Sequence, residues 1–229
     1  MSLKSLEMVI FDNDGVLIDS EKLAARSNAE LLTSLGYPIT MEECEMRFTG
    51  LSDRAMLTML LDQGYDLPDD FIAQMYAVSE EAFETELEPV YGVRAVVEGL
   101  VKKSVKVAVA SNAPRLNVLK NLRTTGYDDL LPPEVCFSGL DVARPKPAPD
   151  LHRHILHRFD QLPDTALVVE DSPAGAKGAC EAGVPFVGVL YAVADHMKTQ
   201  RIEEFRALGA LAIVESPEEL GETLNRHVA

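Results

Sequence analysis

Two aspartates, one residue apart, follow a short apolar run near the start of the chain. The run Met8-Val9-Ile10-Phe11 continues directly into Asp12-Asn13-Asp14-Gly15. Two carboxylates at this spacing can hold a divalent cation through hard oxygen ligands, and one of them can attack phosphorus as a nucleophile. The same residues are also compatible with an Asp-Gly turn that caps the next helix. A catalytic role for the two aspartates therefore requires further polar residues elsewhere in the chain.

Three further polar clusters come directly after, or close to, later apolar segments. They are Ser111-Asn112 after residues 105–110, Lys146 in the proline-rich stretch 144–150, and Glu170-Asp171-Ser172 after residues 166–169. Taken singly, such residues are usually helix caps or solvated loop positions. If the apolar segments are parallel strands, however, their carboxyl ends share one edge of a sheet, and the clusters converge beside Asp12.

The apolar segments that would position these clusters alternate with helical patterns. Strands are predicted at residues 8–11, 105–110, 135–137, 166–169, 185–190 and 211–214. Helices are predicted between and after them, at residues 93–103, 114–125, 150–159, 172–182, 195–208 and 217–227. This alternation predicts an α/β fold with a doubly wound, mainly parallel sheet.

Strand signals are missing between about residues 20 and 88, where four helical segments follow one another. They cover residues 20–35, 41–48, 53–63 and 68–87. We therefore predict a helical-bundle cap domain at residues 18–89, inserted into an α/β core domain that consists of residues 1–17 and 90–229.

Bulk composition limits the partners and the compartment. The 229 residues carry a net charge of −16, which disfavours nucleic acid and anionic membrane as main partners because both would be repelled. No apolar stretch approaches the roughly 20 residues that span a bilayer. Three scattered cysteines favour reduced thiols. We therefore expect a cytoplasmic monomer that acts on a small molecule.

The four clusters, in this order, resemble the four signatures of the haloacid dehalogenase-like (HAD) hydrolases. The motifs that carry the resemblance are Phe11-Asp12-x-Asp14-Gly15-Val16-Leu17-x-Asp19-Ser20, Ser111, Lys146-Pro147-x-Pro149-Asp150 and Glu170-Asp171-Ser172-x-x-Gly175. Their form is similar to the branch that has a helical cap in this position, which includes phosphatases and β-phosphoglucomutase-like enzymes. The resemblance covers essentially the whole chain and implies a Rossmann-like core with an inserted cap.

The resemblance also implies a role for each acidic residue. Asp12 would be the nucleophile that forms an aspartyl-phosphate, and Asp14 the general acid and base. Mg²⁺ would be held by Asp12, by Asp171 and by the backbone carbonyl of Asp14, with Glu170 in the outer shell of the metal.

The remaining site residues would act on the phosphoryl group. Lys146 adds a positive charge that offsets the phosphate, and Ser111 and the backbone N–H of Asn112 add neutral donors. Arg54 could reach a substrate from the cap, next to the loop 49–53, although an ordinary surface arginine is equally compatible with that position. The implied partner is a small phosphorylated metabolite, such as a sugar phosphate or a phosphorylated sugar acid.

Other chemistries of the same family differ in their residues. Dehalogenases of this family lack the second aspartate, and phosphonatase-like members need a cap lysine, for which residues 20–88 offer only Lys22. The main alternative is a β-phosphoglucomutase-like mutase, which would use Asp12 and Asp14 in the same way. Such mutases typically carry a serine-lysine pair at the second signature, whereas this chain has Ser111-Asn112. A phosphorylated receiver-like signalling module is disfavoured by the inserted cap.

Three histidines between residues 152 and 157 invite a zinc site. Their spacing, His152-x-His154-x-x-His157, cannot place all three on one face of a helix. We therefore predict a surface helix without a metal at this position.

Overall fold

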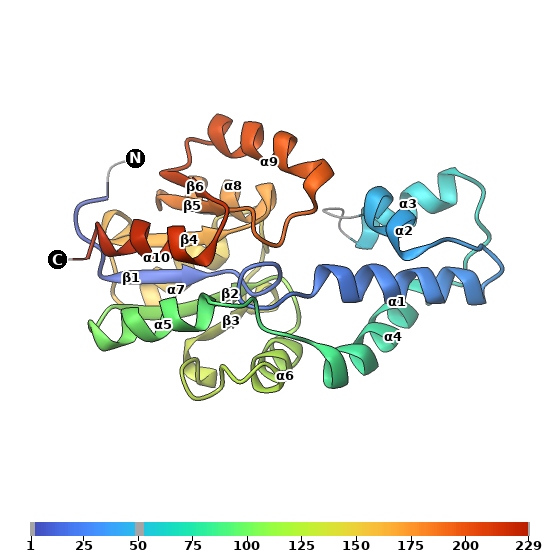
Figure 1. The fold of residues 1–229 in the computed structure, drawn as a ribbon, viewed down its shortest axis with the longest axis horizontal. Helices are drawn as coiled ribbons and strands as arrows, with labels where there is room; N and C mark the ends of the chain where they lie inside the picture. Colours follow the sequence, from blue (N-terminus) through green and yellow to red (C-terminus); the bar gives the residue numbers. More distant parts are fainter. Residues whose placement is uncertain (1–2, 49–52, 229) are drawn as a thin grey trace. The chain divides into compact units, whose positions relative to one another are not determined.

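The computed structural model describes residues 3–48 and 53–228 of the chain (Figure 1). The chain divides into two compact units. One unit contains Met1–Ile18 and Pro89–Ala229, and the other contains Asp19–Glu88. The chain therefore passes from the first unit to the second and back again.

The first unit is built on a six-stranded sheet. Its strands are β1 (Met8–Phe11), β2 (Lys106–Ser111), β3 (Cys136–Ser138), β4 (Ala166–Glu170), β5 (Phe186–Val189) and β6 (Ala212–Val214). They lie in the order β3-β2-β1-β4-β5-β6, and every neighbouring pair is parallel. This confirms the predicted doubly wound α/β fold. The strand order changes direction at β1, so the carboxyl end of β1 is the place where such sheets bind ligands.

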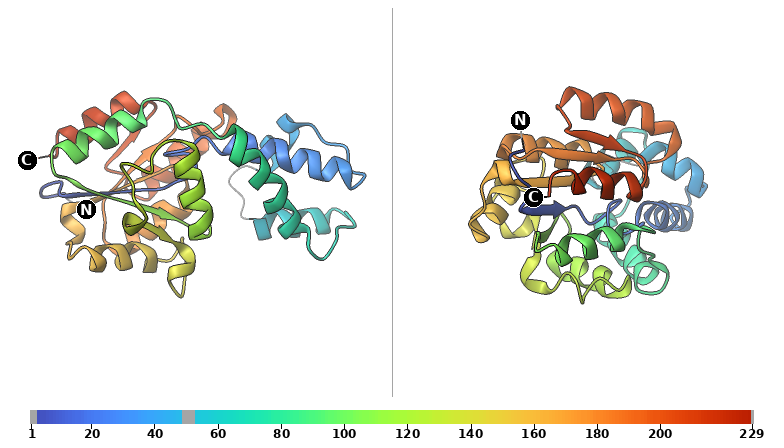
Figure 2. Two further views of the ribbon diagram at one scale, coloured as in Figure 1. Left: turned by 90° about the horizontal axis from the view of Figure 1, so that it is seen from below. Right: turned by 60° about the vertical axis from the view of Figure 1, so that its left-hand side comes forward.

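Helices cover both faces of this sheet. Helices α5 (Val93–Lys102) and α10 (Pro217–Asn225) pack together on one face, and α7 (Asp150–Arg158) and α8 (Pro173–Ala182) pack together on the other (Figures 1 and 2). Helix α9 (Asp195–Ala207) packs on α8, and α6 (Arg115–Thr124) packs beside β3. Short 3-10 turns occur at Pro133–Val135, Gly139–Asp141 and Pro163–Thr165.

Alternation along the strands explains why both faces are covered. Met8 and Ile10 of β1 join a buried apolar cluster with residues of α7, α8 and α9. Val9 and Phe11, which alternate with them and therefore point to the opposite face, are equally buried. Strands that are buried on both faces appear in the sequence as continuous apolar runs, which is the pattern that predicted them.

In the unit Asp19–Glu88, all the regular secondary structure of the described residues is helical. It contains α1 (Glu21–Ser34), α2 (Met41–Phe48), α3 (Asp53–Asp62) and α4 (Phe71–Glu86). Its core is a cluster of buried side chains, which includes Leu32, Cys44, Phe48, Leu60 and Phe71. Arg26 of α1 forms two hydrogen bonds of 2.7 and 2.8 Å with the carboxylate of Glu86 on α4 and so ties the two longest helices of the unit together. Residues 49–52 of the predicted loop 49–53 lie outside the described residues.

Two expectations from composition can be compared with the structure. In the described parts of the chain, no helix is both long and apolar enough to cross a membrane. Cys44, Cys136 and Cys180 are all free thiols, and the first two are buried.

Candidate active site

The turn after β1 brings two acidic residues to the carboxyl edge of the sheet. The backbone N–H of Asp12 still bonds to the carbonyl of Val169 at 2.9 Å, so Asp12 is fixed beside the end of β4. The chain then curls back, and Gly15 adopts φ +70°, a conformation that favours glycine. A Cβ at Gly15 would collide with the carboxylate of Asp171. The glycine therefore lets Asp171 lie directly against the Asp14-Gly15 backbone.

Three buried carboxylates meet at this edge. Asp12, Glu170 and Asp171 each offer a carboxylate oxygen, and these oxygens lie within 4.8 Å of one another. We call these three residues the acidic cluster. A group of this size and spacing could hold a metal ion through hard oxygen ligands.

Lys146 lies inside the acidic cluster. Its Nζ donates to Asp12 Oδ1 at 2.7 Å and to Glu170 Oε2 at 2.9 Å, and its side chain is only 4% exposed. The side chain of Asn112 holds the lysine backbone from both sides. Asn112 Nδ2 donates to the Lys146 carbonyl at 2.9 Å, and the Lys146 N–H donates to Asn112 Oδ1 at 3.0 Å. Asn112 therefore fixes the loop that delivers the lysine.

Glu170 is held by the start of the following helix. The Ser172 hydroxyl donates to Glu170 Oε1 at 2.7 Å, and the Ser172 N–H donates to the same oxygen at 3.2 Å. The same hydroxyl accepts from the Gly175 N–H at 3.1 Å and so caps α8. A Cβ at Gly175 would collide with the Glu170 carboxylate. The spacing Glu170-Asp171-Ser172-x-x-Gly175 is thus explained by one compact arrangement.

Asp14 lies on the other side of the edge, next to β2. The Ser111 hydroxyl donates to Asp14 Oδ2 at 3.4 Å, and Asn13 Nδ2 donates to the same oxygen at 3.3 Å. Ser111 is itself buried, and its oxygen accepts from the Ala113 N–H at 3.1 Å. Asp14 is half-buried, whereas Asp12 is buried.

Seven of the eight predicted site residues therefore meet at one edge of the sheet. They are Asp12, Asp14, Ser111, Asn112, Lys146, Glu170 and Asp171. The eighth, Arg54, belongs to the unit Asp19–Glu88, where its side chain is exposed on α3. A substrate contact of Arg54 stays a prediction.

The charges of the site are out of balance. Burial raises the pKa of Asp12, and the negative charges of Glu170 and Asp14 add to this effect, while Lys146 opposes it. Burial would also raise the pKa of Glu170, but the Lys146 ammonium outweighs this effect and holds it below its ordinary value. Burial disfavours the ammonium of Lys146, yet both carboxylates hold its pKa above normal. Because the Lys146 ammonium carries one positive charge and contacts two of the three buried carboxylates, the site suits an additional cation.

One histidine contradicts the predicted surface helix. His154 and His157 are exposed on α7, but His152 is completely buried. It lies on the inner side of α7 with Leu151 and Ile155, opposite Gly178 of α8, where the absence of a Cβ leaves room for the ring. Burial lowers the pKa of His152 to about 3, so the ring is neutral at physiological pH. The prediction was wrong for His152 because a polar residue type was assumed to lie on the solvent-exposed face of the helix.

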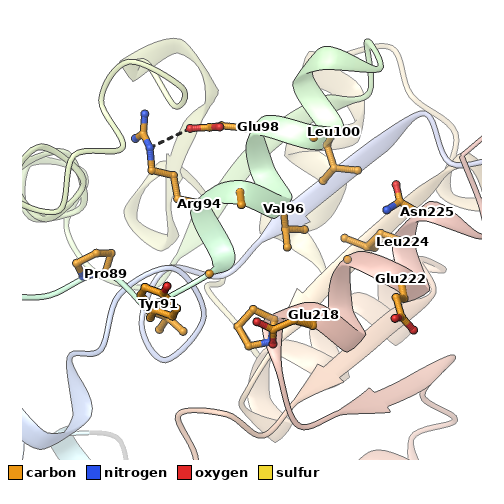
Figure 3. Close-up of a pocket in the computed structure, with 16 residues that line it drawn as sticks. Pro89, Tyr91, Arg94, Val96, Glu98, Leu100, Glu218, Glu222, Leu224 and Asn225 are labelled. Carbon is orange, nitrogen blue, oxygen red and sulfur yellow. Dashed lines mark ion pairs between the residues drawn. The ribbon is translucent and has the colours of Figure 1, made fainter.

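A separate groove of about 790 Å³ lies between α5 and α10 (Figure 3). Apolar side chains such as Val96 and Leu224 line it, and Arg94 pairs with Glu98 along one side at 3.1 Å. None of the residues that line this groove belongs to the site at the strand ends. The chemistry that the sequence indicates therefore lies elsewhere, at the carboxyl edge of the sheet.

Sequence reasoning missed the residues that support the site from the segment after β5. The Tyr191 hydroxyl donates to the Val16 carbonyl at 3.3 Å, and Arg201 Nη1 donates to the backbone carbonyl of Asp171. Neither residue belongs to a motif. The position of Arg201 in the helix predicted at residues 195–208 gave no signal that distinguished it from the surface arginines.

Comparisons with known proteins agree with this geometry. Residues 9–189 match the family described as haloacid dehalogenase-like hydrolase. The chain is 30% identical over 218 residues to the phosphorylated carbohydrates phosphatase of Thermotoga maritima, covering 94% of this chain and 96% of that one. It is 28% identical over 195 residues to the 6-phosphogluconate phosphatase of Escherichia coli, covering 84% and 85% of the two chains.

A solved structure is similar over nearly the full length as well. The HAD family hydrolase of Deinococcus radiodurans, determined with bound phosphate and sodium, aligns with a TM-score of 0.81 and 27% identity. The alignment covers 97% of this chain and 96% of that one. Since the family match spans most of the chain and the signature residues meet at one sheet edge, the protein belongs to the haloacid dehalogenase-like hydrolases.

Proposed function

We propose that this protein is a Mg²⁺-dependent phosphatase that hydrolyses small phosphomonoesters through an aspartyl-phosphate. The observation that carries the proposal is the different surroundings of two aspartates at one sheet edge. Asp12 is buried and contacts the Lys146 ammonium, whereas Asp14 is half-buried and accepts hydrogen bonds from the neutral donors Ser111 and Asn13. These surroundings support Asp12 as the nucleophile and Asp14 as the group that exchanges protons.

The residues present fit a magnesium ion. Asp12, Asp171 and the backbone carbonyl of Asp14 would hold it, and a bound ion would offset the negative charge of the phosphoryl group. Glu170 is assigned to the outer shell, because Lys146 and Ser172 already occupy its two carboxylate oxygens. The acidic cluster holds three buried carboxylates, and the Lys146 ammonium contacts two of them, which supports a magnesium ion at this place.

The chain's own residues then account for both half-reactions. A carboxylate oxygen of Asp12 forms a bond to phosphorus, the ester P–O bond breaks, and Asp14 gives its proton to the leaving alcohol. Lys146 and Ser111 stabilise the transferring group. In the second step Asp14 takes a proton from water, the water oxygen attacks phosphorus, and inorganic phosphate leaves as the carboxylate of Asp12 is restored.

The proposed substrates are phosphorylated carbohydrates, namely sugar phosphates or phosphorylated sugar acids. Two relatives are named for such activity, one as a phosphorylated carbohydrates phosphatase and one as a 6-phosphogluconate phosphatase. Arg54 is the candidate for contacts with the substrate outside its phosphate.

Hydrolysis rather than internal transfer is the expected outcome, and the role of Asn112 supports it. Its side-chain amide is used to hold the Lys146 backbone, at the position where a mutase of this family would place a lysine. We expect one inorganic phosphate per substrate consumed across a panel of hexose phosphates, 6-phosphogluconate and phosphoglycolate. The decisive arm uses β-glucose 1-phosphate with Mg²⁺ and a trace of the 1,6-bisphosphate. Rapid formation of glucose 6-phosphate with little free phosphate would replace the phosphatase by a mutase.

Removal of metal is expected to silence the enzyme. Without a cation, the three buried carboxylates repel both each other and the incoming phosphate, so we expect at least about a 100-fold loss of activity in EDTA. Added Mg²⁺ should restore the rate, which is followed by phosphate release. A matched sample that receives EDTA already saturated with Mg²⁺ controls for effects of the chelator itself. Full activity in excess EDTA would show that the acidic cluster works without a metal.

A further inference from the structure

A buried arginine lies directly behind the acidic cluster. Arg201 of α9 is 4% exposed, and its Nη1 donates a hydrogen bond to the backbone carbonyl of Asp171. Its guanidinium carbon lies 5.9 Å from the centre of the Phe205 ring, and its Nε lies 3.4 Å from Glu204 Oε2. A buried cation with this reach is uncommon, because removing a charge from water is costly unless specific partners compensate.

The packing of α9 explains how the arginine reaches this carbonyl. Phe205 lies directly on Gly188 of β5, where a Cβ would collide with its ring. Gly188 pairs with Glu170 in the sheet register, so Phe205 is anchored at the level of Glu170. The helix returns antiparallel to the strands, as helices do between parallel strands. Arg201, one turn before Phe205 on the same face of α9, therefore reaches the level of the next residue, Asp171.

Asp171 is thus held from two sides. Gly15 allows the turn after β1 to press against its carboxylate, and Arg201 holds its carbonyl from the opposite end of the residue. The backbone at Asp171 follows the last residue of β4 and precedes the cap of α8. A fixed carbonyl at this corner limits the rotation that would carry the carboxylate away from Asp12.

We infer that Arg201 is a positioning residue for the metal site and sets Mg²⁺ affinity through the backbone of Asp171. This inference rests on the proposed function, because it assigns Asp171 to the metal. Groups that orient metal ligands typically change metal affinity by about 10- to 100-fold when they are removed. A purely structural role predicts something different, namely a lower melting temperature with the Mg²⁺ affinity unchanged.

The test compares Arg201→Met and Arg201→Lys with the control Arg206→Met. Arg206 lies on the same helix and is exposed, so its replacement removes the same charge without touching Asp171. Mg²⁺ binding is measured by calorimetry on the full chain, together with the melting temperature with and without Mg²⁺ and the Mg²⁺ concentration that gives half-maximal activity.

We expect Mg²⁺ to bind about 10- to 100-fold more weakly to Arg201→Met, with the substrate KM little changed at saturating Mg²⁺. Arg201→Lys should recover part of the loss, because an ammonium can also donate to the carbonyl, and Arg206→Met should bind like the wild type. If Arg201→Met binds Mg²⁺ within about threefold of the wild type, the inference is wrong while the proposed function stands. If Arg201→Met fails to fold, Arg201→Gln, which also removes the charge and is shorter, takes its place, and Mg²⁺ affinity within about threefold of the wild type in that variant overturns the inference. No binding to the wild type would instead overturn the proposed metal and the inference with it.

Discussion

Asp12→Asn is expected to lower phosphate release by at least about 10,000-fold, the size of effect seen when the nucleophile of an enzyme is removed. The amide has almost the same volume, but it is a poor nucleophile and a weaker ligand for a cation. Lys146 keeps its hydrogen bond of 2.9 Å to Glu170, so its charge does not become unpaired. The loss should therefore appear in turnover and not in the fold.

The measurement is the initial rate of phosphate release at saturating Mg²⁺, together with the melting temperature. Asp62→Asn is the matched control, because Asp62 is an exposed aspartate at the end of α3 and the substitution is chemically identical. The control should retain full activity. Turnover by Asp12→Asn within about tenfold of the wild type would refute Asp12 as the nucleophile.

The fold could be predicted from the sequence because its strands are buried on both faces. Residues 105–110 were predicted as a strand and the structure places β2 at Lys106–Ser111, a shift of one residue. The six apolar runs and the helices between them left few alternatives to a parallel sheet. The 3-10 turn Gly139–Asp141 was not predicted, because its capping box closes through Ser138 and Asp141, two residues that have no periodic pattern around them.

The sequence predicted those site residues that lie at strand ends or belong to recognisable motifs. The rule that parallel strands end at one edge predicted that Ser111 lies near the two aspartates, and its hydroxyl contacts Asp14. Lys146, which follows the end of β3 by eight residues, contacts Asp12 from a loop. The way Lys146 is held could not be predicted, because the two hydrogen bonds with Asn112 depend on the path of a loop 34 residues away. The contact of Arg201 with Asp171 could not be predicted for a related reason, because it depends on where Phe205 packs along β5.

Lys146 connects the stability of the core with the proposed chemistry. Its ammonium lies between Asp12 and Glu170 and contacts their carboxylates at 2.7 and 2.9 Å. Burying two carboxylates without it would leave their negative charges without a cation between them. The same ammonium is placed where it can offset the charge of a phosphoryl group on Asp12. One side chain therefore has two separable effects.

Lys146→Met is accordingly expected to lower the free energy of unfolding by about 3–5 kcal/mol, because it breaks a buried ion pair and leaves both carboxylates unpaired. The free energy of unfolding is measured by urea denaturation in the presence of EDTA, so that no bound metal offsets the charges of the carboxylates. Lys177→Met is the control, since Lys177 is an exposed lysine of α8 whose contact with Glu181 at 3.9 Å contributes little.

The double variant Lys146→Met/Glu170→Gln separates the two effects. Replacing Glu170 removes one of the two buried carboxylates that Lys146→Met leaves without a cation. The double variant should therefore regain a substantial part of the stability that Lys146→Met loses. A double-mutant cycle measures this gain as a coupling energy between the two residues. Its phosphatase activity should nevertheless stay at least about 100-fold below that of the wild type, because nothing replaces the ammonium next to Asp12. If Glu170→Gln adds its own destabilisation in full, the two residues are not energetically coupled and Lys146 does not balance the charge of Glu170. If the double variant instead regains activity together with stability, the role of Lys146 is structural and the transferring phosphoryl group does not depend on its charge.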